Sequence, residues 1–364
     1  MTPPKKQFYP FSVLIILLAV SLYLTSKPYY NWDLFPYMAL AAANSSIPFD
    51  STHAYVYKEA AFRMPPRDFA AVSQRQPQLM EHAETFRTIL KYFEIKPGYV
   101  LAVRLFHFLG FNLVTATYLP SIVSYFFIGC LLLVWMQKIF DMPFAMLTTL
   151  LIAASPFLVQ TARYSSPDML CAAILLAGIF LISESSFPVL GLLVCGLTIP
   201  VRPDSVILFG FLILALYLNK RLSLTHTLAF MILGGVTTFM VIGNFGLLKE
   251  FGFTTQSYSP SWGATERIQH YVSALKSGLH SVMVSHTVIM VFFAAFTLFL
   301  RKKSTHQILD DLWSLLIIAA LATFIVRYVL HPIVEDRFLI ACYLIFIIGF
   351  CSTIRDVLHF KSNV

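Results

Sequence analysis

The chain is organised as long apolar runs separated by short polar segments. A run of about 20 apolar residues is long enough to cross the hydrocarbon core of a bilayer as a helix. The pattern predicts about ten such spans, several of them short. They cover residues 8–26, 112–137, 143–160, 168–183, 187–200, 204–218, 225–246, 280–300, 310–330 and 338–354. We therefore expect an all-α polytopic integral membrane protein.

The longest stretch between two predicted spans, residues 27–111, contains helical patterns of its own. In QLMEHAETFRTILKYFEI, one helical stripe carries the apolar residues Leu79, Ala83, Phe86, Leu90 and Phe93. The segment that follows, KPGYVLAVRLFHFLGF, predicts a second and more apolar helix entered through Pro97 and Gly98. Such amphipathic helices lie along a membrane surface.

Composition agrees with a membrane protein. Of the 364 residues, 58% are hydrophobic and 12% are charged, and the mean hydropathy is +0.74. Soluble domains carry about 25% charged residues. The net charge of +8 does not indicate nucleic-acid binding, because much of it falls in the short loops between spans.

The basic residues orient the chain. With the N-terminus in the cytoplasm, the inner side receives Lys5, Lys6, Lys138, Lys220, Arg221, Arg301, Lys302, Lys303, Arg355 and Lys361. This matches the positive-inside rule. We expect cytoplasmic termini, an outer loop at 27–111, and one membrane domain over 1–364 with no soluble C-terminal domain. Residues 5–26 also resemble a signal peptide, but no small-residue cleavage site follows, so we interpret them as a retained helix.

The outer side, in this orientation, receives mixed acids and bases: Asp33, Asp50, His53, Arg163, Asp168, Arg202, Asp204, Glu266, Arg267, His331, Glu335, Asp336 and Arg337. Ionisable groups at membrane depth are costly and often functional, so we expect a shared outward cavity. Helix capping is the alternative for Asp168, Asp204 and Asp33. Asp50 and His53 fit a turn and a surface histidine, with a metal pair as the weaker interpretation.

Three stretches, in this order, resemble the GT-C superfamily of membrane glycosyltransferases. They are NWDLFPYMALA with Asp33, ARYSSPDML with Arg163 and Asp168, and HPIVEDRFLIACYLIF with Glu335 and Arg337. The second is similar to aminoarabinose and protein mannosyl transferases. The third is similar to the H-x-E-x-RF stretch of lipid-linked-oligosaccharide and GPI mannosyltransferases, although His331 stands further from Glu335 here.

The resemblance implies a polyprenyl-phosphate-linked sugar as donor and an inverting displacement by an acceptor hydroxyl. It implies Asp33 as the general base, a role worth about 10²–10⁴-fold in rate. Cations must meet the leaving phosphate, and we expect Arg337 first, then Arg202 and Arg163. Substrate-orienting residues would be Glu335, Asp168, His331, Trp32 and Tyr37. Both aromatic residues equally fit the interfacial belt.

This chemistry requires no cofactor and is compatible with a divalent cation. The expected partners are the lipid-linked sugar, a glycolipid, glycan or protein acceptor, and membrane lipid. The compact chain without a retention signal favours a bacterial inner membrane, with the active site facing the periplasm. Two other classes stay open: a transporter or flippase of a polar lipid or solute, and a non-catalytic membrane protein of the same fold.

Overall fold

The structure is a computed structural model that describes residues 8–43, 48–185, 187–243, 264–301, 305–332 and 335–362. Its regular elements in these ranges are helices, which confirms the all-α class. The chain divides into two compact units. The first contains Met1–Ala173 with Pro200–Arg202, and the second contains Ile174–Ile199 with Pro203–Val364.

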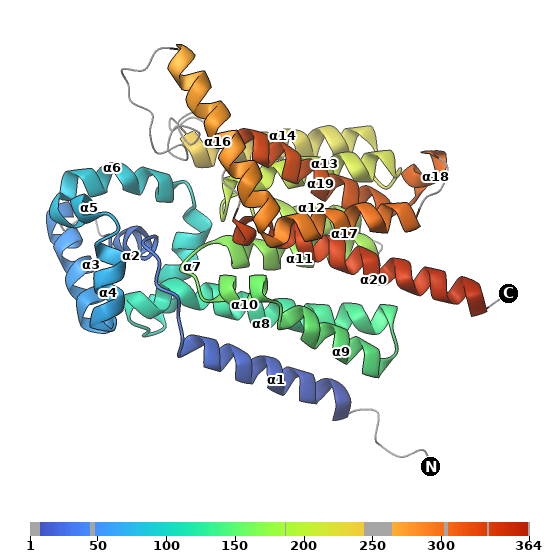
Figure 1. The fold of residues 1–364 in the computed structure, drawn as a ribbon, viewed down its shortest axis with the longest axis horizontal. Coiled ribbons are helices and arrows are strands. Elements are labelled where there is room, and N and C mark those ends of the chain that lie inside the picture. Colours follow the sequence, from blue (N-terminus) through green and yellow to red (C-terminus); the bar gives the residue numbers. More distant parts are fainter. Residues whose placement is uncertain are drawn as a thin grey trace. The chain divides into compact units, whose positions relative to one another are not determined.

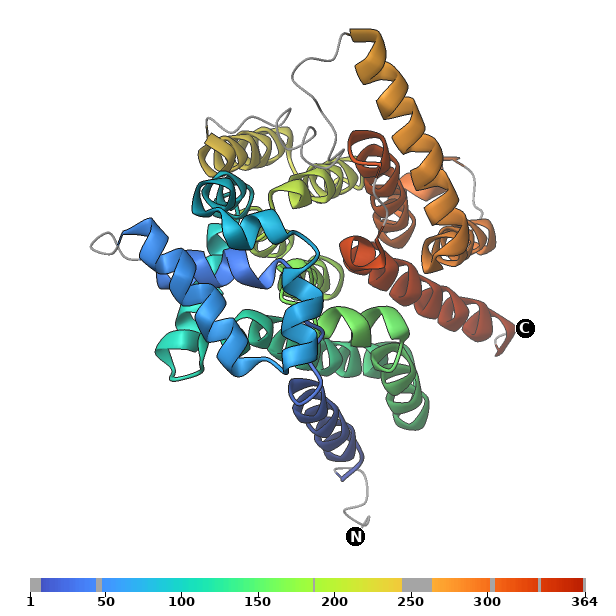
Figure 2. The same cartoon turned by 60° about the vertical axis from the view of Figure 1, so that its left-hand side comes forward.

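The first unit combines long helices with a group of short ones (Figure 1). Its helices are α1 (Phe8–Thr25), α2 (Leu34–Ala42), α3 (Phe49–Arg63), α4 (Pro66–Ser73), α5 (Pro77–Glu81), α6 (Ala83–Glu94), α7 (Pro97–Phe108), α8 (Leu113–Ile139), α9 (Met142–Ala153), α10 (Pro156–Ala162) and the start of α11 (Asp168–Glu184). Helices α1, α8 and α9 run side by side. The short helices α3 to α6 come forward in Figure 2.

The second unit consists mainly of apolar helices. It contains the rest of α11, then α12 (Pro188–Gly196), η2 (Pro203–Ser205), α13 (Val206–Leu218), α14 (Leu224–Ile242), α16 (Ala264–Val284), α17 (His286–Leu300), α18 (Thr305–Asp310), α19 (Leu312–Leu330), η4 (Asp336–Leu339) and α20 (Ile340–Ser362). Helix α13 packs against α14 and α19, and α20 packs against α17 and α19.

Fewer helices are long enough to cross a membrane than the sequence predicts. Among the described residues, four qualify by length and apolarity: α8, α14, α19 and α20 with its preceding turn. The number rises to six if the bent pairs α9–α10 and α16–α17 each count as one span. An integral membrane protein with several candidate spans is confirmed, but the prediction of about ten spans is wrong.

Helix breaks and short helices explain the difference. The predicted span 143–160 is interrupted before Pro156, where α10 leaves the direction of α9 by 58°. Proline lacks an amide hydrogen and favours the first position of a new helix. The predicted spans 187–200 and 204–218 give helices of nine and 13 residues. At 1.5 Å per residue, these fall short of a hydrocarbon core about 30 Å thick.

The surface helices of 27–111 follow the predicted apolar stripe. Leu79, Phe86, Leu90 and Phe93 are all buried. The prediction of one continuous helix there is wrong, because α5 ends at Glu81 and α6 begins at Ala83, with extended backbone at His82. The second predicted helix is confirmed as α7, with proline at its first position. Between the predicted spans 225–246 and 280–300, residues 247–263 lie outside the described part, and residues 264–279 belong to α16.

Candidate functional site

Asp33 stands at the start of α2, immediately after α1 and the connecting segment. It occupies the N-cap position, yet its side chain makes no capping hydrogen bond. Its Oδ2 instead accepts a hydrogen bond of 2.8 Å from Nδ2 of Asn31, which is 6% exposed. Side-chain capping therefore does not explain an aspartate at this position. The contact fixes one carboxylate oxygen beside a buried amide donor.

Asp168 begins α11 and pairs with Arg202. The Arg202 guanidinium donates to Oδ1 of Asp168, and the side chains are 11% and 2% exposed. The backbone just before Arg202 is held in place by a close contact with Gly98. The Gly98 amide donates to the Pro200 carbonyl at 2.9 Å, and a Cβ at Gly98 would come within 2.9 Å of Val201.

The start of α11 carries no serine cap. The Oγ of Ser166, two residues before α11, is buried and has no hydrogen-bond partner among the described residues, so Ser166 does not cap the helix. Asp168 remains at the helix N-terminus, where its charge interacts favourably with the helix dipole. Its buried ion pair with Arg202 accounts for an arginine in this position, which a dipole alone would disfavour.

Tyr99 is a further polar residue of the first unit. It lies in the surface helix α7, is fully buried, and donates from its hydroxyl to the Thr117 carbonyl. Burial raises the pKa of Tyr99 well above its usual value, and the charges of Asp168 and Asp33 raise it further. Asp33, Asn31, Asp168, Arg202 and Tyr99 together form what we call the first cluster.

Arg163 has a supporting position beside this cluster. Its Nε donates to the Lys27 carbonyl, and the Arg163 carbonyl accepts from the Tyr29 amide at 3.0 Å. The rings of Tyr29 and Tyr164 lie 4.7 Å apart. These contacts hold the segment just before Asn31 against the segment just before Asp168.

The two aromatic candidates differ in exposure. Tyr37 is 1% exposed and packs edge-to-face on Phe93 and Tyr99, so it belongs to the core of the surface helices. Trp32 is half-buried and meets Phe93 edge-on at 5.5 Å. Trp32 is therefore the more accessible of the two.

His53 is a core histidine. Its Nε2 forms a hydrogen bond of 2.8 Å with the Leu79 carbonyl, and its ring packs on Tyr57 and Phe86. Asp50 is exposed in the first turn of α3. Across the described ranges, no group of three or more His, Cys, Asp or Glu side chains is arranged to hold a metal ion.

The candidates of the C-terminal motif gather in the second unit around Phe338. Arg337 donates to Glu335 at 2.5 Å and lies over the Phe338 ring at 4.9 Å. Arg327 lies over the same ring at 4.4 Å and pairs with Asp204 at 2.9 Å. The His331 ring lies 6.2 Å from that of Phe338. Cation–π contacts of this kind hold guanidinium groups in place without occupying their hydrogen-bonding edges.

Asp336 contacts residues other than those gathered around Phe338. Its carboxylate meets Nδ1 of His286 at 2.7 Å and accepts a hydrogen bond of 2.9 Å from Tyr343. The hydroxyls of Tyr343 and Thr287 lie 2.6 Å apart. This links the start of α17 to the start of α20.

Three residues of these groups are not among those predicted from the sequence: Arg327, His286 and Asn31. Arg327 and His286 stand at the ends of apolar runs, and that position is the signal for a polar partner nearby. Asn31 is neutral and so was not among the charged candidates. Its position two residues before Asp33 is the feature of the sequence that could have identified it. The first cluster lies in the first unit, and the Phe338 group lies in the second.

Comparison with protein-family models, curated proteins and solved structures finds no match for this chain. The fold defines an integral membrane protein built of helices, with several candidate spans. Any more specific function has to be proposed from the residues themselves.

Proposed function

We propose that this protein is an inverting glycosyltransferase. It moves a hexose or pentose from a polyprenyl-phosphate-linked donor to a glycolipid, glycan or protein acceptor. The reaction takes place at the outer face of a bacterial inner membrane. The observation that carries the proposal is the placement of Asp33, which is oriented by a buried amide and does not cap its helix.

In the proposed reaction, an acceptor hydroxyl attacks the anomeric carbon from the face opposite the phosphate. A new carbon–oxygen bond forms as the bond to the phosphate oxygen breaks, and that oxygen keeps the electron pair. The Asp33 carboxylate takes the hydroxyl proton. Asn31 keeps the carboxylate turned toward the acceptor by holding one of its oxygens.

The leaving lipid phosphate gains negative charge and needs a fixed cation. Arg337 is the proposed partner, with Glu335 orienting its guanidinium. Arg202 and Arg163 have supporting roles in this proposal. Arg202 is committed to the buried Asp168, and Arg163 to the Lys27 carbonyl.

A transporter of a polar lipid or solute is the second candidate. The bent pair α9–α10 favours it, because discontinuous helices line the substrate sites of many transporters. A transporter of the same sugar lipid would also alter envelope glycans when deleted. A transferase requires the Asp33 carboxylate for the chemical step, whereas a transporter does not.

The test compares four strains at equal protein level: wild type, a deletion, and the deletion complemented with Asp33→Asn or with Asp141→Asn. Asp141 is an exposed aspartate at the N-cap of α9 and makes no side-chain cap bond, so Asp141→Asn is the matched control. Mass spectrometry of envelope glycolipids and glycans should show a sugar mass lost in the deletion and with Asp33→Asn. It should return with Asp141→Asn. Full restoration by Asp33→Asn would overturn the assignment of the base.

A further inference from the structure

Helix α16 of the second unit is amphipathic along its 21 residues. One side is apolar, and its side chains are between 42% and 63% exposed: Ile268, Val272, Leu279 and Met283. Their spacing of four, seven and four residues keeps them on one stripe of the helix. The neighbouring side carries exposed polar residues: Gln269, Ser273, Lys276 and His280. The apolar stripe of α16 is therefore left uncovered by the part of the chain that the structure describes.

A third side of α16 holds the helix against the end of α19. The Tyr271 hydroxyl donates to the Val329 carbonyl. In the opposite direction, the Tyr328 hydroxyl of α19 donates to the Leu275 carbonyl of α16 at 2.5 Å. Helix α19 is long and apolar enough to cross the membrane, and it ends at Leu330. These contacts therefore place the middle of α16 at the boundary of the hydrocarbon core.

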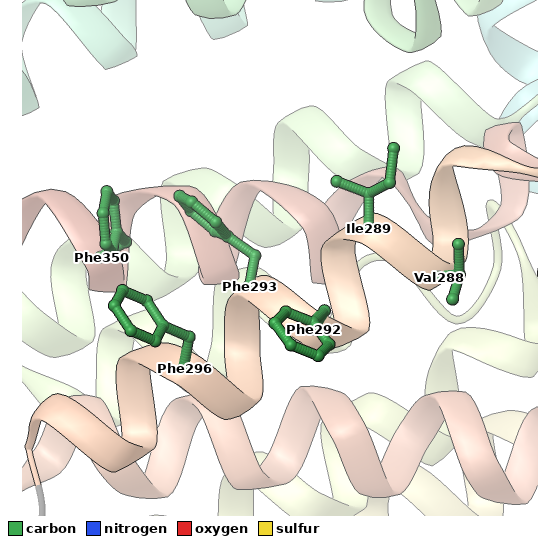
Figure 3. A pocket seen from close by; sticks show the side chains of 6 residues that line it. All are labelled: Val288, Ile289, Phe292, Phe293, Phe296 and Phe350. Atoms are coloured by element: carbon green, nitrogen blue, oxygen red, sulfur yellow. The ribbon is translucent and has the colours of Figure 1, made fainter.

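Helix α17, which follows α16, runs beside α20. Near the two helix starts, the hydroxyls of Thr287 and Tyr343 lie 2.6 Å apart. Further along, the rings of Phe293 and Phe350 lie 4.2 Å apart, and Figure 3 shows them on the two neighbouring helices. Because α20 with its preceding turn qualifies as a span, α17 shares the direction of a span.

Helix α16 departs from that direction. It meets α17 at an angle of 73°, with the break at Ser285 (Figure 1). Membrane helices tilt by about 20° on average, so α16 lies more than about 50° from the membrane normal. Although its 21 residues are enough to cross a bilayer, α16 is not among the four described helices that qualify as spans by themselves. An amphipathic helix with this direction and this depth runs along the membrane surface.

We propose that α16 is an interfacial helix whose partner is the bilayer surface. Its apolar stripe enters the boundary between headgroups and acyl chains, to a depth of about 5–10 Å. Its polar side faces the headgroups and water, and Lys276 on that side is attracted to anionic lipid. The hydroxyl contacts with α19 keep the helix at this depth. The inference does not depend on the proposed function, which is carried by Asp33 in the first unit.

The test uses the full-length protein in liposomes of phosphatidylcholine and phosphatidylglycerol. Single cysteines that carry a nitroxide are introduced at exposed positions of α16, so that folding is little affected. The stripe variants are Ile268→Cys, Val272→Cys, Leu279→Cys and Met283→Cys. The matched controls, each next to a stripe position, are Ser273→Cys and His280→Cys. Electron paramagnetic resonance measures the accessibility of each nitroxide to oxygen, which concentrates among acyl chains, and to a nickel complex, which stays in water. Wild-type protein treated in the same way gives the background from the natural cysteines.

The ratio of oxygen to nickel accessibility should be several-fold higher at Val272→Cys and Leu279→Cys than at their adjacent controls. The ratio should also be similar at the four stripe positions, because a helix in the membrane plane keeps one depth. Three results would overturn the proposal. A ratio that changes steadily along the stripe would mean that α16 enters the bilayer steeply. A ratio typical of water at every position would mean that α16 stands clear of the membrane. Low accessibility of the stripe to both reagents would mean that protein, such as a second copy of this chain, covers it.

Discussion

The ion pair of Arg202 with Asp168 allows a quantitative prediction. Arg202→Met removes the cation and leaves a carboxylate whose side chain is 2% exposed. Removing one partner of a buried pair costs about 3–5 kcal/mol, because the remaining charge stays desolvated. Asp168 also begins α11, where the helix dipole stabilises its negative charge by about 0.3–1 kcal/mol. The expected loss is therefore about 3 kcal/mol, at the lower end of the range.

The assay is thermal unfolding of the purified protein, followed by intrinsic fluorescence. For domains of 150–250 residues, 1 kcal/mol shifts Tm by about 2–4 °C, so we expect a fall of about 6–12 °C. Arg63→Met is the matched control. Arg63 is 45% exposed and pairs with Glu59 on one helix face, a contact worth about 0–1 kcal/mol.

A double variant isolates the cause. Adding Asp168→Asn to Arg202→Met removes the uncompensated charge and should recover most of the lost Tm. A Tm within about 2 °C of wild type for Arg202→Met would refute the reasoning, given the scale used above. So would a double variant no more stable than the single one. Lost sugar transfer at unchanged Tm would instead identify Arg202 as a phosphate ligand.

Three further predictions follow from other parts of the structure. Arg301→Met should lower Tm, because Arg301 contacts both oxygens of Asp311 at 2.8 and 2.7 Å, and adding Asp311→Leu should restore it. Gly191→Ala should cost about 1–3 kcal/mol in thermal unfolding, because its Cβ would lie 2.6 Å from the Gly178 carbonyl oxygen. Burial raises the pKa of Tyr30 from 10.0 to about 12. Its contribution to stability is therefore complete below pH 10 and lost as pH rises through 12, and Tyr30→Phe should flatten Tm against pH in that window.

The hydropathy pattern predicted the positions of the helices well. It predicted the number of helices that cross the membrane less well. The runs that became α8, α14 and α19 are long, and the structure keeps each as one helix, although α8 contains Pro120 in its interior. The run 143–160 is equally apolar but contains Pro156, and a window average does not register a broken helix. The stripe of α6 was predictable because its period matches a helix, whereas the break at His82 had no signal of that kind.

The sequence predicted which charged residues belong to the site better than it predicted which of them form ion pairs with one another. Arg202 stands two residues from Asp204 in the sequence, yet it pairs with Asp168, while Asp204 pairs with Arg327. Such partners depend on which helices pack together, which periodicity does not determine. Tyr37 was expected from the sequence to orient the substrate, but its position on the buried face of α2 places it in the core.

The most direct test of the central claim is sugar transfer by the purified protein in liposomes. Lipid extracted from the deletion strain supplies unconsumed donor, and its envelope fraction supplies unmodified acceptor. The measurement is the appearance of the sugar mass on the acceptor together with free polyprenyl phosphate. The account predicts transfer by wild type and Asp141→Asn, and a loss of about 10²–10⁴-fold with Asp33→Asn. Transfer by Asp33→Asn at the wild-type rate would contradict it.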